Sequence, residues 1–480
     1  MPGDFNLPQK VRLKWRLSRY LRASWCIKCA PRCPLRFQEV MRLMSDNEST
    51  RNIGNELLEE SYAHFARSLD VIIIHLRDAR NILVAVETLD TDRALAKSVI
   101  LLASASVEAN LASLSTLGVV LAEKYDALAP IQIDYLRGTQ ETIDDRGNAR
   151  MKAVRQSLED RLRRVPALLG QIFGIEFKYP DEDIGNTKLG HVFAYRDAIV
   201  HPRWQRYLND VGFREAALAV DAAEWYLNAV ATPLAPYLNF YNRLLYDMTN
   251  ADGSSPGPVA RRVEQFPPLD QSFTTMPAVG FGKVAMQEWY DMTLMTEFAL
   301  DSQCEGDSDG SMLTRAGLVM LYAMLDAQMA LNAQNYVYNS NTSFSPGEIL
   351  FLTETALDLD AEGNVIAEDS HETFKKRMIG IPRVLSRKAL GAELTISLGD
   401  RMGAGLLRFK DLRDAVMHPR VGEPLPRVTK SELRKAVEAV REYFERLASA
   451  CPDLFGVYRH LLRLGEGRRS RNLSPGHTTP

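Results

Sequence analysis

Apolar side chains recur at three-to-four-residue spacing along most of the chain, which is the pattern of amphipathic α-helices. One such helix is predicted from about residue 52, and a second, rich in Ala, Leu and Ser, over 92–125. Two more are predicted over 186–202 and from Gly212 onward. The first half of the chain is therefore expected to be all-α. The apolar face of the first helix comprises Leu57, Leu58, Tyr62, Phe65, Leu69, Ile72 and Ile73.

One stretch departs from this helical pattern. Residues 131–148 alternate between apolar and polar positions and end in a Gly-Asn turn, which predicts a short β-hairpin or an ordered loop. A basic helix is expected to follow over 149–172. Its positive charge fits either an RNA groove or a solvated helix face, and the presence of Glu159 and Asp160 favours the solvated face.

The second half of the chain repeats this order of elements. Its Ala-rich helix, over 313–335, corresponds to the second helix of the first half. Arg196 and Arg413 lie 217 positions apart, and Glu108 and Asp326 lie 218 positions apart. Because several landmarks keep nearly the same offset, the sequence predicts two copies of one helical domain in tandem.

The most closely matched part of the repeat is an octamer, RDAIVHPR at 196–203 and RDAVMHPR at 413–420. Six of its eight positions are identical, and the other two exchange one apolar residue for another. Packing alone does not require an Arg, an Asp, a His, a Pro and a second Arg to be kept together. The two octamers are therefore the candidate functional motif.

Composition divides the chain into five segments. Residues 250–277 are rich in Pro, Gly and Ser and are interpreted as an interdomain linker. The two helical domains are expected over 44–249 and 278–463. The basic segments at the two ends, 1–43 and 464–480, are predicted to be disordered extensions.

Charge and hydropathy narrow the class of function. The 480 residues carry a net charge of −3, so a basic field over the whole chain is absent and any polyanion site has to be local. The most apolar runs, near 98–107 and 317–325, are shorter than the roughly 18–20 residues of a membrane helix, and no membrane association is expected. The five cysteines do not form a disulfide framework, which favours a reducing, cytoplasmic location.

The first 43 residues carry ten Lys and Arg against two acidic residues, and they contain a cysteine-rich stretch, CIKCAPRC. Its thiols are Cys26, Cys29 and Cys33, whereas a structural zinc site uses four ligands and the nearest further candidate is His64. A mobile basic extension, or a true start near Met41 or Met44, is favoured over a metal site and over an organellar transit peptide. No metal or other cofactor is expected.

Each octamer combines a proton-transfer group with an anion-binding group. Pro202 disfavours helical backbone at His201, so the histidine is expected at the end of its helix. The helix C-terminus favours the imidazolium form, and Asp197, four residues earlier, can accept a ring N–H and orient the ring. Arg196 presents a planar fork of donors suited to a phosphate. The second octamer supplies the same set in Arg413, Asp414 and His418.

An Arg and a His separated by four residues at a helix end, in an all-helical domain, resemble the RxxxxH motif of the HEPN superfamily. The resemblance covers most of 50–248 and 282–462, and its specific part is the octamer. Family members often have Asn after the Arg, whereas both copies here have Asp. Glu108 and Asp326 resemble the acidic residue that such domains carry in the preceding long helix.

The resemblance implies two HEPN-like helical bundles, each with a small hairpin or loop insertion, whose motifs form one composite site. It also implies metal-independent cleavage of RNA (tRNA, mRNA or phage RNA), with attack of the ribose 2′-OH on its own phosphorus to give a 2′,3′-cyclic phosphate. The implied catalytic residues are Arg196, His201, Arg413 and His418, with supporting roles for Asp197, Asp414, Glu108 and Asp326. The flanking Arg203, Arg206 and Arg420 are the candidates for phosphate contacts.

Two hypotheses of function follow. The first is an endoribonuclease, acting in phage defence or as a toxin, with its two domains paired within one chain or in a homodimer. The second is a non-catalytic HEPN-like module that binds or senses RNA or a protein partner. An Asp–His pair before a Pro also fits a structural role, and a duplication would preserve structural residues too. Because both halves retain the Arg and the His, the sequence favours the enzyme.

Overall fold

A computed structural model describes most of the chain between residues 48 and 472. Within that range it leaves out the segments 90–92, 144–148, 154–155, 178–181, 204–206, 209–210, 239, 250–271, 276–279, 302–310, 360–364, 370–372 and 419–422. The described residues form fourteen helices and six short strands, so the fold is mostly helical, as the sequence predicts.

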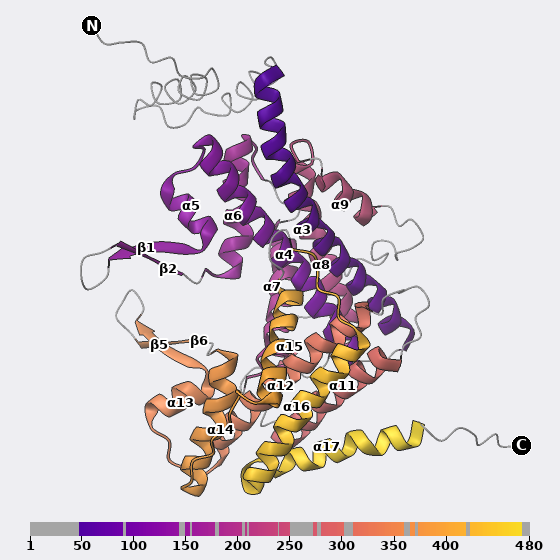
Figure 1. Cartoon of the computed structure of the whole chain (residues 1–480), viewed down its shortest axis with the longest axis vertical. Coiled ribbons are helices and arrows are strands. Elements are labelled where there is room, and N and C mark those ends of the chain that lie inside the picture. The colour runs from indigo at the N-terminus through magenta and orange to yellow at the C-terminus, as the bar shows by residue number, and fades with distance from the viewer. Residues whose placement is uncertain are drawn as a thin grey trace, which may run out of the picture.

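The first series of elements runs from residue 48 to residue 249. Two long helices lead, a short helix and a hairpin follow, and four further helices complete the series (Figure 1). The bounds are α3 Glu48–Leu89, α4 Arg93–Tyr125, α5 Pro130–Arg137, β1 Thr139–Ile143, β2 Ala149–Ala153, α6 Leu158–Phe173, α7 Glu182–Val200, β3 Tyr207–Leu208, α8 Phe213–Leu234 and α9 Phe240–Thr249.

The second series has the same order of long helices, short helix, hairpin and further helices. Its bounds are α11 Phe281–Asp301, α12 Ser311–Asn339, α13 Pro346–Thr353, β5 Thr355–Leu359, β6 Val365–Asp369, α14 Phe374–Leu390, α15 Arg401–Met417, α16 Lys430–Ala450 and α17 Pro452–Asn472. The two hairpins have the same register, since Thr139 pairs with Ala153 and Thr355 pairs with Asp369. Both hairpins project from the same side of the molecule (Figure 1).

The helices α4 and α12 form the centre of the molecule. Both are apolar around most of their circumference, so they can be buried only when other helices surround them. Helix α4 contacts α3, α6, α7 and α8 of its own series and also α11, α12 and α15 of the second. One continuous apolar core therefore runs through both series.

These central helices correct one expectation. The uninterrupted apolar runs of the sequence are shorter than a membrane helix, yet the helices Arg93–Tyr125 and Met312–Asn339 are both long and apolar enough to cross a membrane. The most apolar windows of the two helices are 72% and 94% buried inside the structure, which is the situation of core helices in a folded domain.

The helices that carry the octamers are fixed by close contacts. On α7, a Cβ added at Gly185 would lie 2.0 Å from the Trp225 ring of α8, so only glycine allows the two helices to approach this closely. On α15, the Asp400 side chain caps the first turn by accepting the Gly403 N–H at 2.9 Å. The first turn of each helix is therefore fixed in the fold.

Several predicted boundaries are wrong in detail. The predicted hairpin over 131–148 begins only at Thr139, because Pro130–Arg137 forms the short helix α5. The predicted basic helix from 149 starts as strand β2, and helix α6 begins at Leu158, where the Ser157 side chain caps it. Pro at the first helical position and Gly138 as C-cap explain why so short a helix as α5 forms.

The predicted linker and termini lie largely outside the described residues. Of the segment 250–277, only 272–275 is described, and Phe273–Thr274 there forms β4, which pairs with β3. The extension 1–43, with its three cysteines, is not among the described residues. Helix α17 continues to Asn472, so the first part of the segment predicted as a disordered tail, 464–480, is helical.

Candidate functional site

The two octamers end α7 and α15. The backbone N–H of His201 donates to the Asp197 carbonyl at 2.7 Å, and that of His418 donates to the Asp414 carbonyl at 2.7 Å. Each histidine therefore completes the last turn of its helix, as the following proline predicts. At His418 the backbone has already left helical geometry, with φ −129° and ψ 65°.

Glu108 of α4 lies between the two octamers. Its Oε1 accepts a hydrogen bond from Arg196 Nη2 at 2.5 Å, and its Oε2 lies 2.9 Å from His418 Nδ1. The Glu108 side chain is only 12% exposed, so the carboxylate acts from inside the fold. An arginine of the first octamer and a histidine of the second thus share one carboxylate, which brings the two motifs to the same place.

Electrostatics keep this carboxylate charged. Burial on its own raises the pKa of Glu108, but the hydrogen bond with His418 and the charge of Arg196 outweigh it and lower the pKa below its usual value. Burial likewise opposes the charge of Arg196, and the neighbouring carboxylates of Glu108 and Asp197 raise the pKa of that guanidinium. Both partners are therefore ionised at neutral pH.

The aspartates next to the arginines each contact the neighbouring guanidinium. Asp197 accepts from Arg196 Nη1 at 2.6 Å, and Asp414 accepts from Arg413 Nη1 at 3.0 Å and from Lys410 at 2.5 Å. The carboxylate that meets His418 Nδ1 is that of Glu108, not that of Asp414 four residues earlier. The aspartates therefore hold the arginines.

Asp326 of α12, which corresponds to Glu108, faces another group. It accepts from Arg377 Nη2 at 2.8 Å, and Arg377 Nη1 donates to Glu354 at 3.0 Å. Burial raises the pKa of Asp326, against the charges of Arg377 and Arg413. All three members of this cluster have side chains less than 10% exposed. Asp326 is thus held within the second series of elements.

The predicted phosphate contacts are only partly described. Arg203 is half-buried, and its charge acts on Glu354 of the second series, so the end of the first octamer approaches the other series. Arg206 and Arg420 lie outside the described residues. Among the residues that the structure describes, the buried Nε atoms of Arg196 and Arg413 have no hydrogen-bond partner.

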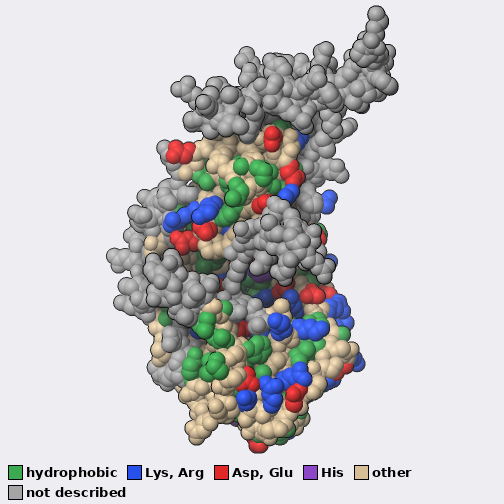
Figure 2. Space-filling model, turned by 90° about the vertical axis from the view of Figure 1, so that its left-hand side faces the viewer, with side chains coloured by type: hydrophobic (Ala, Val, Ile, Leu, Met, Phe, Trp, Pro, Cys, Tyr) green, Lys and Arg blue, Asp and Glu red, His purple; other side chains and the backbone are tan. Residues whose placement is uncertain are grey.

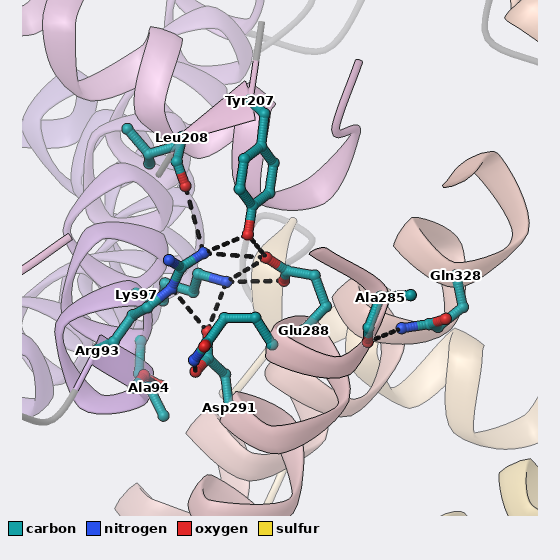
Figure 3. Close-up of polar contacts among 11 residues, drawn as sticks. Arg93, Ala94, Lys97, Tyr207, Leu208, Ala285, Glu288, Asp291 and Gln328 are labelled. Carbon is teal, nitrogen blue, oxygen red and sulfur yellow. Dashed lines mark hydrogen bonds and ion pairs between the residues drawn. The ribbon is translucent and has the colours of Figure 1, made fainter. Parts of the chain in front are cut away.

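A second charged cluster joins α4 and β3 of the first series to α11 of the second (Figure 3). Lys97 of α4 lies 2.7 Å from Glu288 and 2.8 Å from Asp291, both on α11. Arg93 donates to Asp291 at 2.9 Å, and the Tyr207 hydroxyl of β3 donates to Glu288 at 3.0 Å. Because Tyr207 follows the octamer closely, this cluster anchors the chain just after the motif.

A reciprocal ion pair joins α12 of the second series to α3 of the first. Arg315 of α12 pairs with Asp78 of α3 at 2.5 Å, with both side chains less than 10% exposed. Lys97 and Arg315 are 218 positions apart, and Asp78 and Asp291 are 213 apart. The second helix of each series therefore pairs with the first helix of the other. The offset of the first helices (213) differs by five from that of the second helices (218), so spacing along the chain does not predict these partners. The folded structure shows that the pairs exchange between the two series.

The surface carries mixed charge. On the face in Figure 2, Lys and Arg side chains are interspersed with Asp and Glu, and hydrophobic side chains lie between them.

A cavity of about 470 Å³ opens between α11, α12 and α17, with Phe281, Asn332 and Tyr458 in its lining. Among the described residues, no group of three or more His, Cys, Asp or Glu is placed to hold a metal ion.

Comparison with known proteins does not indicate a family or a function, because no family model, curated protein or solved structure matches the chain. The geometry at the octamers therefore carries the interpretation. A half-exposed imidazole, an ionised buried carboxylate and two guanidinium groups are suited to binding an anion and moving a proton beside it.

Proposed function

We propose that the chain is a metal-independent endoribonuclease made of two HEPN-like domains in tandem, with one composite site at the two octamers. The observation that carries the proposal is the Glu108 bridge, in which Arg196 of the first octamer and His418 of the second contact the same carboxylate. Two motifs 217 positions apart meet there, as a composite site requires.

Internal duplication is part of the proposal. The matching order of elements, the equal hairpin registers and the exchange of Lys97–Asp291 for Arg315–Asp78 support it. An exchange of this kind is expected of two related units packed around a two-fold axis. In such a pair, residue i of the first unit contacts residue j of the second, and residue j of the first contacts residue i of the second.

The chemistry proposed is transesterification of RNA. One histidine accepts the proton of the ribose 2′-OH as its oxygen attacks the adjacent phosphorus, and the other donates a proton to the departing 5′-oxygen. Arg196 and Arg413 stabilise the charge that develops on the phosphoryl oxygens. The products are a 2′,3′-cyclic phosphate and a 5′-OH, so an RNA with a 2′-deoxy residue at the cleaved position should remain intact.

The test is cleavage of total RNA and of tRNA by purified protein in EDTA, with His201→Ala and His418→Ala variants in parallel. Loss of a general acid or base should lower the rate on the order of 10²- to 10⁴-fold in each variant. His460→Ala is the matched control, because His460 is an exposed histidine on α17 and its removal should leave the rate unchanged.

Two results would contradict the proposal. Intact RNA at high concentrations of folded wild-type protein would exclude a constitutive nuclease, and cleavage that survives both histidine substitutions would place the activity elsewhere. Retention of labelled RNA on the protein without cleavage would support the non-catalytic binding module instead.

A further inference from the structure

The His418 ring is anchored through one of its two nitrogens. Nδ1 lies 2.9 Å from Glu108 Oε2, and the side chains of the two residues are 49% and 12% exposed, respectively. The carboxylate thus contacts the ring from the inner side, while half of the ring surface faces outward. Since Nδ1 and Nε2 lie on different edges of an imidazole, anchoring of Nδ1 leaves Nε2 as the nitrogen for reaction.

The acceptor belongs to the other series of elements. Glu108 is on α4, whereas His418 follows α15, so the ring is oriented across the contact between the two halves. Among the described residues, the charged groups that act on Glu108 are His418, Arg196 of α7 and Arg161 of α6. All of them favour the ionised carboxylate, which accepts a hydrogen bond but cannot donate one.

The corresponding carboxylate in the second series is engaged elsewhere. Asp326 accepts from Arg377, and Glu354 takes the other end of the same guanidinium. Asp326 therefore balances the buried charge of Arg377 within its own series, whereas Glu108 serves a residue of the other series.

We infer that the two arms of the proposed site are inequivalent: Glu108 holds Nδ1–H of His418 across the halves so that Nε2 exchanges protons with the substrate, whereas Asp326 is a structural partner of Arg377. This inference rests on the proposed function for its catalytic part. Its structural part, the protonation of His418 on Nδ1, can be tested without substrate. Glu108 is a positioning residue in this scheme, because it acts through His418.

The test is the ¹⁵N spectrum of the imidazole nitrogens in full-length protein labelled at histidine. The chain has eight histidines, and the His418 signals are assigned by their loss in His418→Ala. In wild-type protein at a pH where the ring is neutral, Nδ1 is expected to carry the proton. Glu108→Ala should abolish this preference, and Glu108→Gln should retain it because the amide oxygen can still accept the Nδ1 proton.

Three controls separate this contact from others. Arg196→Ala removes the other partner of Glu108 and should leave the His418 proton on Nδ1. Asp326→Asn should also leave it there. Glu123→Gln, on the same helix, removes only an exposed ion pair with Arg137. The inference is overturned if Glu108→Ala leaves the His418 tautomer unchanged, or if Asp326→Asn shifts it as far.

Cleavage provides the second readout. Glu108→Ala should lower kcat by about 100-fold, because a misplaced catalytic group costs on the order of that factor, and Glu108→Gln should recover much of the loss. Equal losses in both variants would mean that charge alone matters and would overturn the positioning role. If wild-type protein cleaves no RNA, the proposed function fails, while the tautomer measurement still decides the geometry.

Discussion

Glu108 and Asp326 occupy corresponding positions in the two halves of the molecule, yet their surroundings differ. Glu108 extends from α4 to a histidine of the other half, whereas Asp326 contacts Arg377 on α14 of its own half. The same backbone framework thus supports a carboxylate that links the halves and one that does not. Residues at matching positions of the two series need not share a role.

The difference can be traced to the position after the short helix of each half. Arg377 is buried between Asp326 and Glu354, and Glu354 is the left-handed C-cap of α13, with φ 51°. The corresponding C-cap of α5 is Gly138, with φ 65° and no side chain. Arg161, which corresponds to Arg377, therefore lacks this second acid, and its charge acts on Glu108 instead.

The largest effect is expected from truncating the two carboxylates. Asp326→Ala leaves the Arg377 charge without one of its partners in a site that excludes water, and should lower the free energy of unfolding by about 3–5 kcal/mol. Glu108→Ala should cost less, because His418 is half-exposed and its ring can be hydrated. Urea unfolding followed by circular dichroism measures both values.

A larger loss for Glu108→Ala than for Asp326→Ala would reverse this comparison. Asp326→Asn is the milder companion variant, because the amide oxygen can still accept from Arg377. If the folded yield of Asp326→Ala is too low to measure, the ranking is tested with the two amide variants.

The second effect is the direction in which each carboxylate changes the free energy of unfolding as the pH falls. The expected change is smaller than that of truncation, because only the charge of the side chain is altered. Glu108 has its pKa lowered from 4.5, so its contribution to stability is complete above pH 4.5 and is lost as the pH falls through the folded-state value. Asp326 has its pKa raised from 3.8, so protonation stabilises the fold as the pH falls toward 3.8.

These opposite signs can be measured as differences from wild type. Below about pH 5, where an ordinary histidine is already charged, the destabilisation by Glu108→Gln should shrink with acidification, and that by Asp326→Asn should grow. Urea unfolding at several pH values gives both slopes, and the other carboxylates cancel in the difference. Slopes of equal sign would show that the two carboxylates are in equivalent environments.

The third effect concerns the RNA binding that we propose for the first half. Arg161 faces the Glu108 site, whereas Arg163 and Arg164 on the same helix pair with Glu159 and Asp160 one turn earlier. In the His418→Ala background, Arg161→Ala should weaken RNA binding by roughly 10-fold and reduce the salt dependence by about one counterion. Arg163→Ala is the matched control and should have a smaller effect.

Fluorescence anisotropy with a labelled single-stranded RNA at several salt concentrations provides the measurement. Equal weakening by Arg161→Ala and Arg163→Ala would indicate a diffuse basic surface rather than a phosphate contact at the site.

The sequence predicts the helices better than it predicts the site. Helical periodicity places α4 and α12, and the proline after each histidine places the ends of α7 and α15. The same local reasoning selects Asp414 as the partner of His418, because a residue four positions earlier is near in a helix. The actual partner, Glu108, is 310 positions away. Such a contact depends on how the halves pack, which no spacing along the chain encodes.

The smallest effect concerns how each half starts the helix after its octamer. Thr429 caps α16 by accepting the Glu432 N–H at 3.1 Å, and its own N–H donates to Glu432 Oε2 at 3.0 Å. At the matching position before α8, Gly212 donates its N–H to Glu215 at 3.0 Å but has no side chain to return the contact. One half therefore has a complete capping box and the other has half of one.

Thr429→Ala should lower the free energy of unfolding by about 1 kcal/mol, and Thr429→Ser should preserve it. Gly212→Ser should raise stability by roughly a few tenths of a kcal/mol, because serine adds the missing acceptor. An added Cβ at Gly212 would lie 3.9 Å from Glu215 Oε2, which is an ordinary contact, and φ is −141°. Urea midpoints measured together would test both changes, and a loss of stability in Gly212→Ser would mean that the backbone before α8 needs glycine for a reason other than capping.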